Sequence, residues 1–319
     1  MKLVILDGYT ENPGDLSWKW IEDLGCELTV YDSTPPQLIV ERGQDADIIV
    51  TNKCVFTKEI IDQLPKLKYI QVIATGYNVI DCVAAKEKGI TVCNIPSYST
   101  NGVAQLVFSL LLELTQQVAV HNESVKSGEW VNSEHFCYQK TYLTEIANKT
   151  MGIIGFGKIG QAVAQIANAF NMKVIAYAPR PKEYTGFGEV EFVSLDELTK
   201  TSDVITLHCP LTAETDKLVN SEFLSKCKKS VYIINTARGG VVDEEALADA
   251  LNNNRIAGYG ADVLLTEPPK PNNPLLTSAN SFITPHIAWA NIESRTRLMN
   301  IFKDNLKAFL EGKPINKVN

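Results

Sequence analysis

The sequence lacks the features that would cross-link a chain covalently or draw it to a polyanion. Its seven cysteines are scattered, odd in number and without a C-x-x-C pair. This argues against a disulfide framework and favours reduced thiols in a cytoplasmic protein. The net charge of −7 and the pI of about 5.3 argue against nucleic-acid and membrane-surface partners, because both favour basic patches. A small anionic substrate is compatible with this charge, since one local arginine is enough to bind it.

Long unbroken apolar runs are also missing. The most apolar stretch, residues 103–120, is interrupted by Gln, Ser, Glu and Thr, so it is too polar to span a bilayer. We expect a buried helix there, with Thr100 or Asn101 near its N-cap. The N-terminal apolar run is interrupted by Asp7 and predicts a first strand rather than a signal peptide. The 319 residues, 45% of them hydrophobic, predict two globular domains without low-complexity tracts.

The sequence does have a repeated alternation of short Val/Ile-rich runs with helical patterns. Such runs indicate parallel sheets covered on both faces, hence an α/β fold of two doubly wound units. The first sheet is predicted from residues 2–6, 27–32, 47–52, 69–76 and 91–94. The second is predicted from residues 150–157, 173–178, 203–210, 230–237, 256–263 and 282–286. Helices are expected between the strands, including 243–253 capped by Asp243, and again from about 290 to 310.

A glycine pattern follows the first strand of the second sheet. Gly155, Gly157 and Gly160 form G-x-G-x-x-G between an apolar strand and a helical segment, which is the context that gives this motif its meaning. The first glycine permits a tight turn, the second lets the backbone approach a pyrophosphate, and the third lets helix and strand pack closely. The pattern predicts a dinucleotide site at the helix N-terminus.

One expected part of such a site is missing. An acid normally ends the next strand and binds the adenosine ribose, but Ala178 stands there, followed by Arg180 and Lys182. These two cations are suited to a 2′-phosphate. Alternatively, both are solvated surface charges and another group holds the ribose.

Three residues are candidates for chemistry. Arg238 directly follows an apolar strand, where its planar fork suits a carboxylate, although a structural ion pair is the alternative. His286 follows the last strand and has the titration range of a general acid or base. Glu267, 19 residues earlier, could bond its other ring nitrogen, fix the tautomer and favour the charged ring. His208 also ends a strand, and we expect it to line the cofactor cleft rather than do chemistry.

Four ordered motifs carry a resemblance to a known family. They read GIIGFGKIG (152–160), INTARGGVVDEEAL (234–247), ADVLLTEPP (261–269) and ITPHIAWA (283–290). Together they resemble the D-isomer-specific 2-hydroxyacid dehydrogenases. ATGYNVID (74–81) and SGEW (127–130) match too, so the resemblance covers nearly the whole chain. Within the family, the sequence is most similar to glycerate dehydrogenases, also called hydroxypyruvate reductases.

The resemblance implies a fold of two Rossmann-like domains with a cleft between them. The substrate domain, flavodoxin-like, would comprise residues 1–100 and 288–319. The dinucleotide-binding domain would comprise residues 101–287. The long helix after Asn101 would support a homodimer.

The resemblance also implies reduction of a small 2-keto acid by NAD(H) or NADP(H). Arg238 would bind the substrate carboxylate and polarise the keto group, His286 would donate a proton to the keto oxygen, and Glu267 would hold His286 protonated. The expected substrates are hydroxypyruvate and glyoxylate, giving D-glycerate and glycolate. These roles agree with the chemistry of 2-keto acid reduction, which needs one cation, one proton donor and one hydride source.

Further contacts are implied by position in the family motifs. The substrate contacts would be Thr75, Gly76, Arg238 and Trp289. The cofactor contacts would be Gly155, Gly157, Lys158, Ile159, Gly160, Ala178, Arg180, Cys209, Pro210, Thr215, Thr236, Ala237, Arg238, Asp262 and His286. Asp262 would contact the nicotinamide end. Asn52 and Lys53, which end the third predicted strand, are further candidates to face the cleft. For Lys53 the alternative is an ordinary surface charge. No metal site is predicted.

The chain departs from the commonest family pattern at Ala178, where most NAD-dependent members carry Asp. Members that use NADP often lack this acid and have a nearby Arg, so we predict that NADP(H) is accepted. D-lactate and phosphoglycerate dehydrogenases are alternatives, although the latter often carry a C-terminal regulatory domain, whereas the sequence here stops soon after its last predicted helix. Formate dehydrogenases use Gln at the position of Glu267. A dinucleotide-sensing corepressor-like regulator is the alternative of another class.

Overall fold

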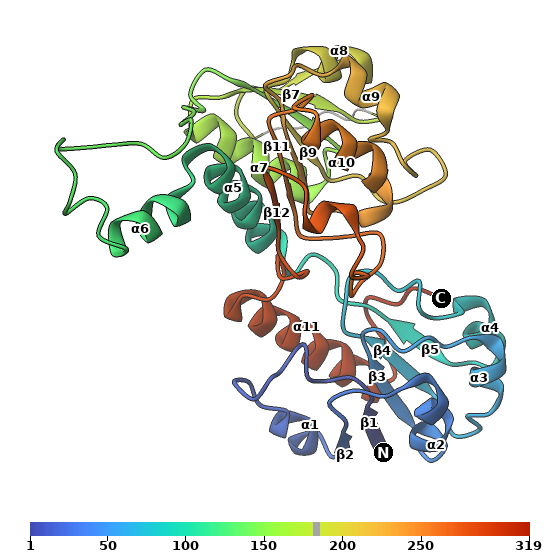
Figure 1. The fold of residues 1–319 in the computed structure, drawn as a ribbon. Helices are drawn as coiled ribbons and strands as arrows, with labels where there is room; N and C mark the ends of the chain where they lie inside the picture. The colour runs from blue at the N-terminus through green and yellow to red at the C-terminus, as the bar shows by residue number, and fades with distance from the viewer. Residues whose placement is uncertain (181–185) are drawn as a thin grey trace. The chain divides into compact units, whose positions relative to one another are not determined.

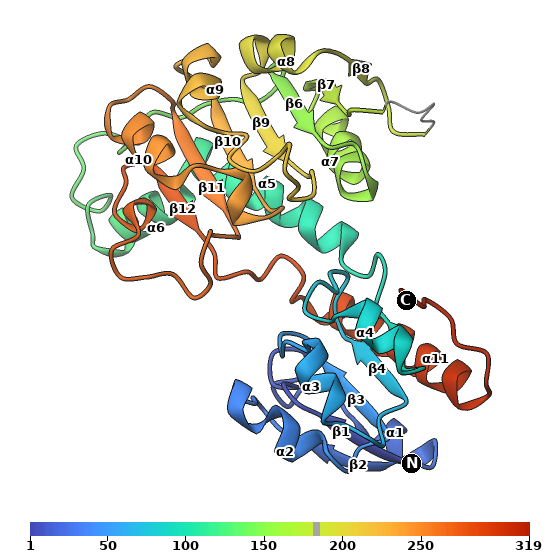
Figure 2. The ribbon, with the colours of Figure 1, turned by 90° about the vertical axis from the view of Figure 1, so that its right-hand side faces the viewer.

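The chain folds into two compact α/β units, each built on a parallel sheet. The structure is a computed structural model that describes residues 1–180 and 186–319 (Figures 1 and 2). Unit 1 comprises Met1–Ser99 and Trp289–Asn319, and unit 2 comprises Thr100–Ala288. Unit 2 is therefore inserted into unit 1 along the chain, as the predicted fold class requires.

Unit 1 contains a five-stranded sheet in the order β2-β1-β3-β4-β5. Its strands are β1 (Lys2–Ile5), β2 (Glu27–Val30), β3 (Ile48–Thr51), β4 (Tyr69–Val72) and β5 (Thr91–Cys93). One face packs on α1 (Lys19–Asp23) and the C-terminal α11 (Ile292–Leu310). The other packs on α2 (Ile39–Gly43), α3 (Lys58–Asp62) and α4 (Cys82–Glu87), with the 3-10 helix η1 (Pro36–Leu38) preceding α2. Because both faces are covered, every residue of the inner strands β3 and β4 is buried.

Unit 2 contains a seven-stranded sheet in the order β12-β11-β10-β9-β6-β7-β8. Its strands are β6 (Thr150–Ile154), β7 (Lys173–Tyr177), β8 (Glu191–Phe192), β9 (Val204–Leu207), β10 (Tyr232–Asn235), β11 (Gly258–Ala261) and β12 (Ser281–Ile283). Its helices are α5 (Thr100–Gln116), α6 (Val118–Lys126), α7 (Lys158–Ala169), α8 (Leu195–Thr201), α9 (Ser221–Lys226) and α10 (Glu244–Asn252), with η2 (Gly239–Val241) and η3 (Pro274–Leu276). Every strand pair is parallel, so all carboxyl ends meet at one edge.

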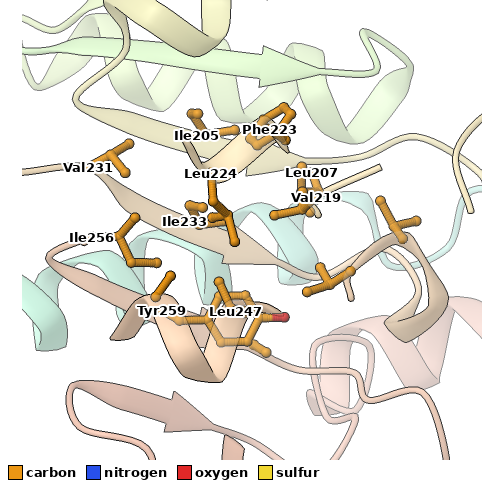
Figure 3. Packing of buried hydrophobic residues seen from close by; sticks show 14 of the residues in the cluster. Ile205, Leu207, Val219, Phe223, Leu224, Val231, Ile233, Leu247, Ile256 and Tyr259 are labelled. Atoms are coloured by element: carbon orange, nitrogen blue, oxygen red, sulfur yellow. The ribbon is translucent and has the colours of Figure 1, made fainter. Parts of the chain in front are cut away.

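Alternate strand residues divide unit 2 into two cores. Ile233 of β10 joins the core beneath α9 and α10, which also contains Leu224 and Leu247 (Figure 3). The next residue, Ile234, joins the core beneath α5 and α7. Burying an apolar side chain of this size contributes about 1.5–3 kcal/mol. The two cores hold the sheet rigid, and the sheet in turn fixes the loops at its carboxyl edge.

The elements of unit 2 differ from the sequence predictions in two details. The predicted helix 103–120 is two helices, because Gln117 adopts a left-handed conformation (φ 44°) between α5 and α6. The first begins at Thr100, so Thr100 and Asn101 lie next to its N-cap, as expected. The short edge strand β8 was not predicted, since two residues carry no period. Asp243 does cap α10, as expected, by accepting a hydrogen bond from the Ala246 amide.

No single helix among the described residues is long and apolar enough to cross a membrane. Helices α5 and α6 reach that length and composition only as a pair, bent by 57°. Most of the apolar residues of α5 are buried in unit 2.

Candidate functional site

The carboxyl edge of the unit 2 sheet gathers most of the predicted site. Gly155 follows β6, His208 follows β9, and Asp262 follows β11 directly. Arg238 and His286 lie three residues beyond the ends of β10 and β12. Because all these strands are parallel, their following loops share one edge, where ligands bind in doubly wound sheets.

The glycine loop has the geometry of a dinucleotide cradle. Gly155 has a φ of +94°, and a Cβ there would lie 2.6 Å from the Cys209 amide nitrogen. A Cβ on Gly160 would lie 2.4 Å from the Gly155 carbonyl oxygen, so α7 packs directly on the loop. A Cβ on Gly157 would meet nothing within 4 Å. The loop therefore leaves open the space in which a pyrophosphate approaches the start of α7, whose N-cap is Gly157 itself.

The end of β7 lies beside this loop. The Gly155 amide donates to the Tyr177 carbonyl at 2.9 Å, which places the next residue, Ala178, at the cradle. Ala178 is half-buried and Arg180 is exposed. Lys182, the second predicted phosphate partner, lies outside the described residues.

The loop after β9 is fixed by short polar contacts. Thr215 donates from Oγ1 to the Pro210 carbonyl at 2.6 Å, which closes the turn after the buried Cys209. His208 Nε2 contacts Thr206 Oγ1 at 2.8 Å, and its buried Nδ1 has no partner among the described residues. Burial lowers the pKa of His208 to about 3, so this ring is neutral at physiological pH and is unsuited to act as a general acid.

Glu267 and His286 form a close pair. His286 Nδ1 and Glu267 Oε2 are 2.6 Å apart, and about a third of each side chain is exposed. The other carboxylate oxygen accepts the Leu264 amide at 3.1 Å. An anion at Nδ1 orients the ring, stabilises the imidazolium and leaves Nε2 to face a reactant. His286 also has a φ of +54°, an uncommon conformation of the kind found at functional sites.

Asp262 holds the backbone around His286. Its side chain accepts from Thr284 Oγ1 at 2.6 Å and from the amides of Ile287 and Ala288 at 2.8 Å. Burial raises the pKa of Asp262, against the effect of these hydrogen bonds. The sequence motif did not reveal this contact, because it joins residues more than 20 positions apart.

Arg238 is presented by a buried amide. Asn235 accepts the Ala237 amide through Oδ1 and donates from Nδ2 to the Arg238 carbonyl, both at 3.0 Å. The guanidinium is exposed and donates only to the Ala237 carbonyl within the described part of the chain, where no carboxylate pairs with it. The ion-pair alternative therefore has no support. The half-buried Thr236 has an Oγ1 without a partner in the same part of the chain.

In unit 1, the loops after β3 and β4 are also tied down. Thr75 donates from Oγ1 to the Ile95 carbonyl at 2.9 Å, and Gly76 follows it. The amides of Asn52 and Lys53 donate to Asp7, at 2.9 and 2.6 Å. Trp289 packs edge-on against Tyr98, with ring centroids 6.4 Å apart. Sequence reasoning missed Glu11, a fully buried carboxyl that accepts a hydrogen bond from the Asn52 side chain.

Known proteins resemble this chain along its whole length. The family model described as D-isomer specific 2-hydroxyacid dehydrogenase, NAD binding domain, matches residues 108–288. A hydroxypyruvate reductase of Blautia hydrogenotrophica is 48% identical, with both chains fully covered. A glycerate dehydrogenase of Methylorubrum extorquens is 43% identical over 92% of each chain. A solved acyclic imino acid reductase, in complex with NADPH and D-Arg, matches with a TM-score of 0.86 and 34% identity over both full chains.

Proposed function

Because this chain belongs to the D-isomer specific 2-hydroxyacid dehydrogenase family, we propose that it reduces hydroxypyruvate and glyoxylate to D-glycerate and glycolate. It is an oxidoreductase of 2-hydroxy acids that uses a nicotinamide dinucleotide. The observation that carries the proposal is the 2.6 Å contact between Glu267 and His286 at the sheet edge that also bears the glycine loop. This arrangement supplies an oriented proton donor beside a dinucleotide cradle.

Three side chains divide the chemistry of the reduction. The Arg238 fork binds the substrate carboxylate and polarises the neighbouring keto group. His286 donates a proton from Nε2 to the keto oxygen, and Glu267 stabilises the protonated ring through Nδ1. The bound nicotinamide supplies the hydride. The contacts assigned to the substrate in unit 1 are those of Thr75, Gly76 and Trp289.

A substrate survey tests the proposal. NADH and NADPH are each combined with hydroxypyruvate, glyoxylate, pyruvate and longer 2-keto acids, and kcat/KM is measured for every pair. We expect the highest values with hydroxypyruvate or glyoxylate. A maximum with pyruvate would favour a D-lactate dehydrogenase. If none of these acids supports oxidation of NADH or NADPH, a dinucleotide-sensing regulator is favoured instead.

The cofactor site accepts NADP(H) as well as NAD(H). With Ala178 beside the glycine loop, a 2′-phosphate meets no like charge from this position, and the exposed Arg180 can attract it. The similar imino acid reductase was solved with NADPH. The remaining cofactor contacts are those named from the family motifs, from Gly155 to His286.

The protein forms a homodimer in the cytoplasm. Supporting the dimer, the segment from Val118 to Leu143 projects from unit 2 in Figure 1. It exposes 89% of Val131, 90% of Phe136 and 95% of Tyr142, an apolar surface suited to a second copy. Light scattering measures the mass of the wild type and of Phe136→Ser, and we expect a dimer for the wild type and a smaller mass for the variant. A monomeric mass for both proteins would contradict the dimer. Seven free cysteines support a reducing compartment.

A further inference from the structure

Glu244, the first residue of α10, bridges two points of the loop that carries Glu267. Its Oε1 accepts the Leu265 amide at 2.7 Å, and its Oε2 accepts Asn273 Nδ2 at 2.8 Å. The loop between Leu265 and Asn273 contains Glu267 and no regular secondary structure. One half-buried carboxylate therefore ties both ends of this loop to the rigid start of a helix.

The same stretch of backbone touches the segment after Arg238. A Cβ on Gly239 would lie 2.0 Å from the Leu264 carbonyl carbon and 2.3 Å from the Leu265 nitrogen. The Leu264 amide, in turn, donates to Glu267. The peptide joining Leu264 to Leu265 is thus the point at which the Arg238 loop and the Glu267 loop meet.

We propose that Glu244 is a positioning residue, which holds the Leu264–Leu265 peptide so that the Glu267 carboxylate reaches His286 Nδ1. This inference rests on the proposed function, since it assigns to Glu244 an effect on the proton donor of that reaction. In this role Glu244 acts through its two hydrogen bonds and not by contact with substrate or cofactor. If the bridge is lost, Glu267 moves away from His286, and the ring loses the anion that stabilises its charged form.

The alternative is that Glu244 only stabilises the N-terminus of α10 by its charge. Glu245 provides the matched control, because it is the next residue in the same acidic first turn, is exposed, and makes no side-chain hydrogen bond within the described part of the chain. A residue acting only through the helix dipole would be mimicked by Glu245→Gln.

The experiment compares Glu244→Ala, Glu244→Gln and Glu245→Gln. We expect Glu244→Ala to lower kcat about 10- to 100-fold, a part of the usual contribution of a general acid, with dinucleotide Kd changed less than about twofold. The alkaline limb of the pH profile for keto-acid reduction moves to lower pH, because the imidazolium is less stabilised. Glu244→Gln keeps one acceptor and lies between. Glu245→Gln behaves as the wild type.

A paired exchange tests the geometry directly. Asn273→Asp keeps the oxygen that accepts the Leu275 amide but replaces the donor facing Glu244 with an acceptor. We expect it to impair kcat in the same direction as Glu244→Ala. Adding Glu244→Gln supplies an amide that can donate to the new carboxylate at position 273 and accept from Leu265, so the double variant recovers most of kcat. Failure of the double variant to exceed both single variants would overturn the proposal.

A readout independent of turnover separates this inference from the proposed function. The low-field Nδ1 proton resonance of His286, assigned by its loss in His286→Ala, reports the contact with Glu267. It should shift upfield or broaden in Glu244→Ala and persist in Glu245→Gln. If this occurs in a protein that reduces no 2-keto acid, the proposed function fails while the positioning role stands. An unchanged resonance in folded Glu244→Ala overturns the positioning role.

Discussion

At the scale of single residues, the proposed proton donor His286 gives the most direct test of the site. His286 has one ring nitrogen 2.6 Å from Glu267 and the other available to a reactant. We expect His286→Ala to lower kcat by about 100- to 10,000-fold, the usual contribution of a general acid. Dinucleotide affinity, measured by fluorescence titration, should change little. His135→Ala is the control, since His135 is exposed on the projecting segment. Retained kcat, or a loss confined to dinucleotide affinity, would contradict the assignment.

Arg180 carries the prediction about cofactor choice. It is exposed, so its attraction to a 2′-phosphate is screened, and we expect Arg180→Ala to raise KM for NADPH several-fold while KM for NADH is unchanged. Ala178→Asp should go further, because a carboxylate repels the phosphate and accepts ribose hydroxyls. Lys173→Ala, a cation at the opposite end of β7, serves as the control. An unaltered NADPH/NADH preference in Arg180→Ala would make this arginine a bystander.

At the scale of helices and strands, the sequence predicted an element correctly wherever one periodic run of residues forms a single strand or helix. The strand from Tyr232 and the helix after Asp243 fall inside their predicted ranges. The predicted strands overran at their carboxyl ends, as at 69–76, where β4 ends at Val72. There the apolar pattern continues into loops whose shape is set by distant partners. The same reason hid the supporting contacts of Asp262 and Glu244, since local patterns do not encode hydrogen bonds between segments far apart.

At the junction of the glycine loop and α7, one glycine is needed mainly for dinucleotide binding and another also for stability. Gly157 has an extended conformation that any residue adopts (φ −75°, ψ −168°), and a Cβ there meets nothing. We expect Gly157→Ala to keep the free energy of unfolding within about 0.5 kcal/mol, yet to weaken dinucleotide binding at least about tenfold by filling the pyrophosphate space.

Gly160→Ala is the matched variant. Its Cβ would clash with the Gly155 carbonyl, so we expect a loss of about 1–3 kcal/mol in unfolding free energy together with weaker binding. Urea unfolding of the ligand-free proteins and fluorescence titration give the two quantities. Equal stability losses in both variants would show that the open space at Gly157 is misassigned.

At the scale of the whole molecule, two runs of alternating patterns along the chain predict two sheet units, whereas the return of the chain to unit 1 is implied partly by the family resemblance. What composition does not reveal is a buried acid. Glu11 lies fully inside unit 1 in the loop after β1, near Asp7 and bonded by Thr10 and Asn52. Burial raises the pKa of Glu11 to about 8, despite those hydrogen bonds. A formal charge of −7 counts this carboxyl as ionised, whereas in the folded protein it is protonated over most of the physiological range.

This protonation couples stability to pH with a definite sign. Between about pH 4.5 and 8, folded Glu11 holds a proton that the unfolded chain has released. The unfolded state binds fewer protons, so the free energy of unfolding falls as pH rises, by at most about 1.4 kcal/mol per pH unit from this group. Glu11→Gln, which is neutral throughout, removes that slope. We therefore expect the variant to gain stability relative to the wild type from about pH 5.5 to 7.5.

Urea unfolding followed by tryptophan fluorescence measures this free energy, and the signal reports mainly on unit 1, which contains Glu11. Three of the four tryptophans, Trp18, Trp20 and Trp289, belong to unit 1, and Trp130 belongs to unit 2. Other titrating groups contribute equally to both proteins and cancel in the difference. Glu27→Gln, an exposed acid on β2, controls for the loss of one formal charge and should leave the slope unchanged. Parallel pH dependences for wild type and Glu11→Gln would mean that Glu11 is ionised in the folded protein, and that its contact with Asn52 joins an anion to the loop after β3.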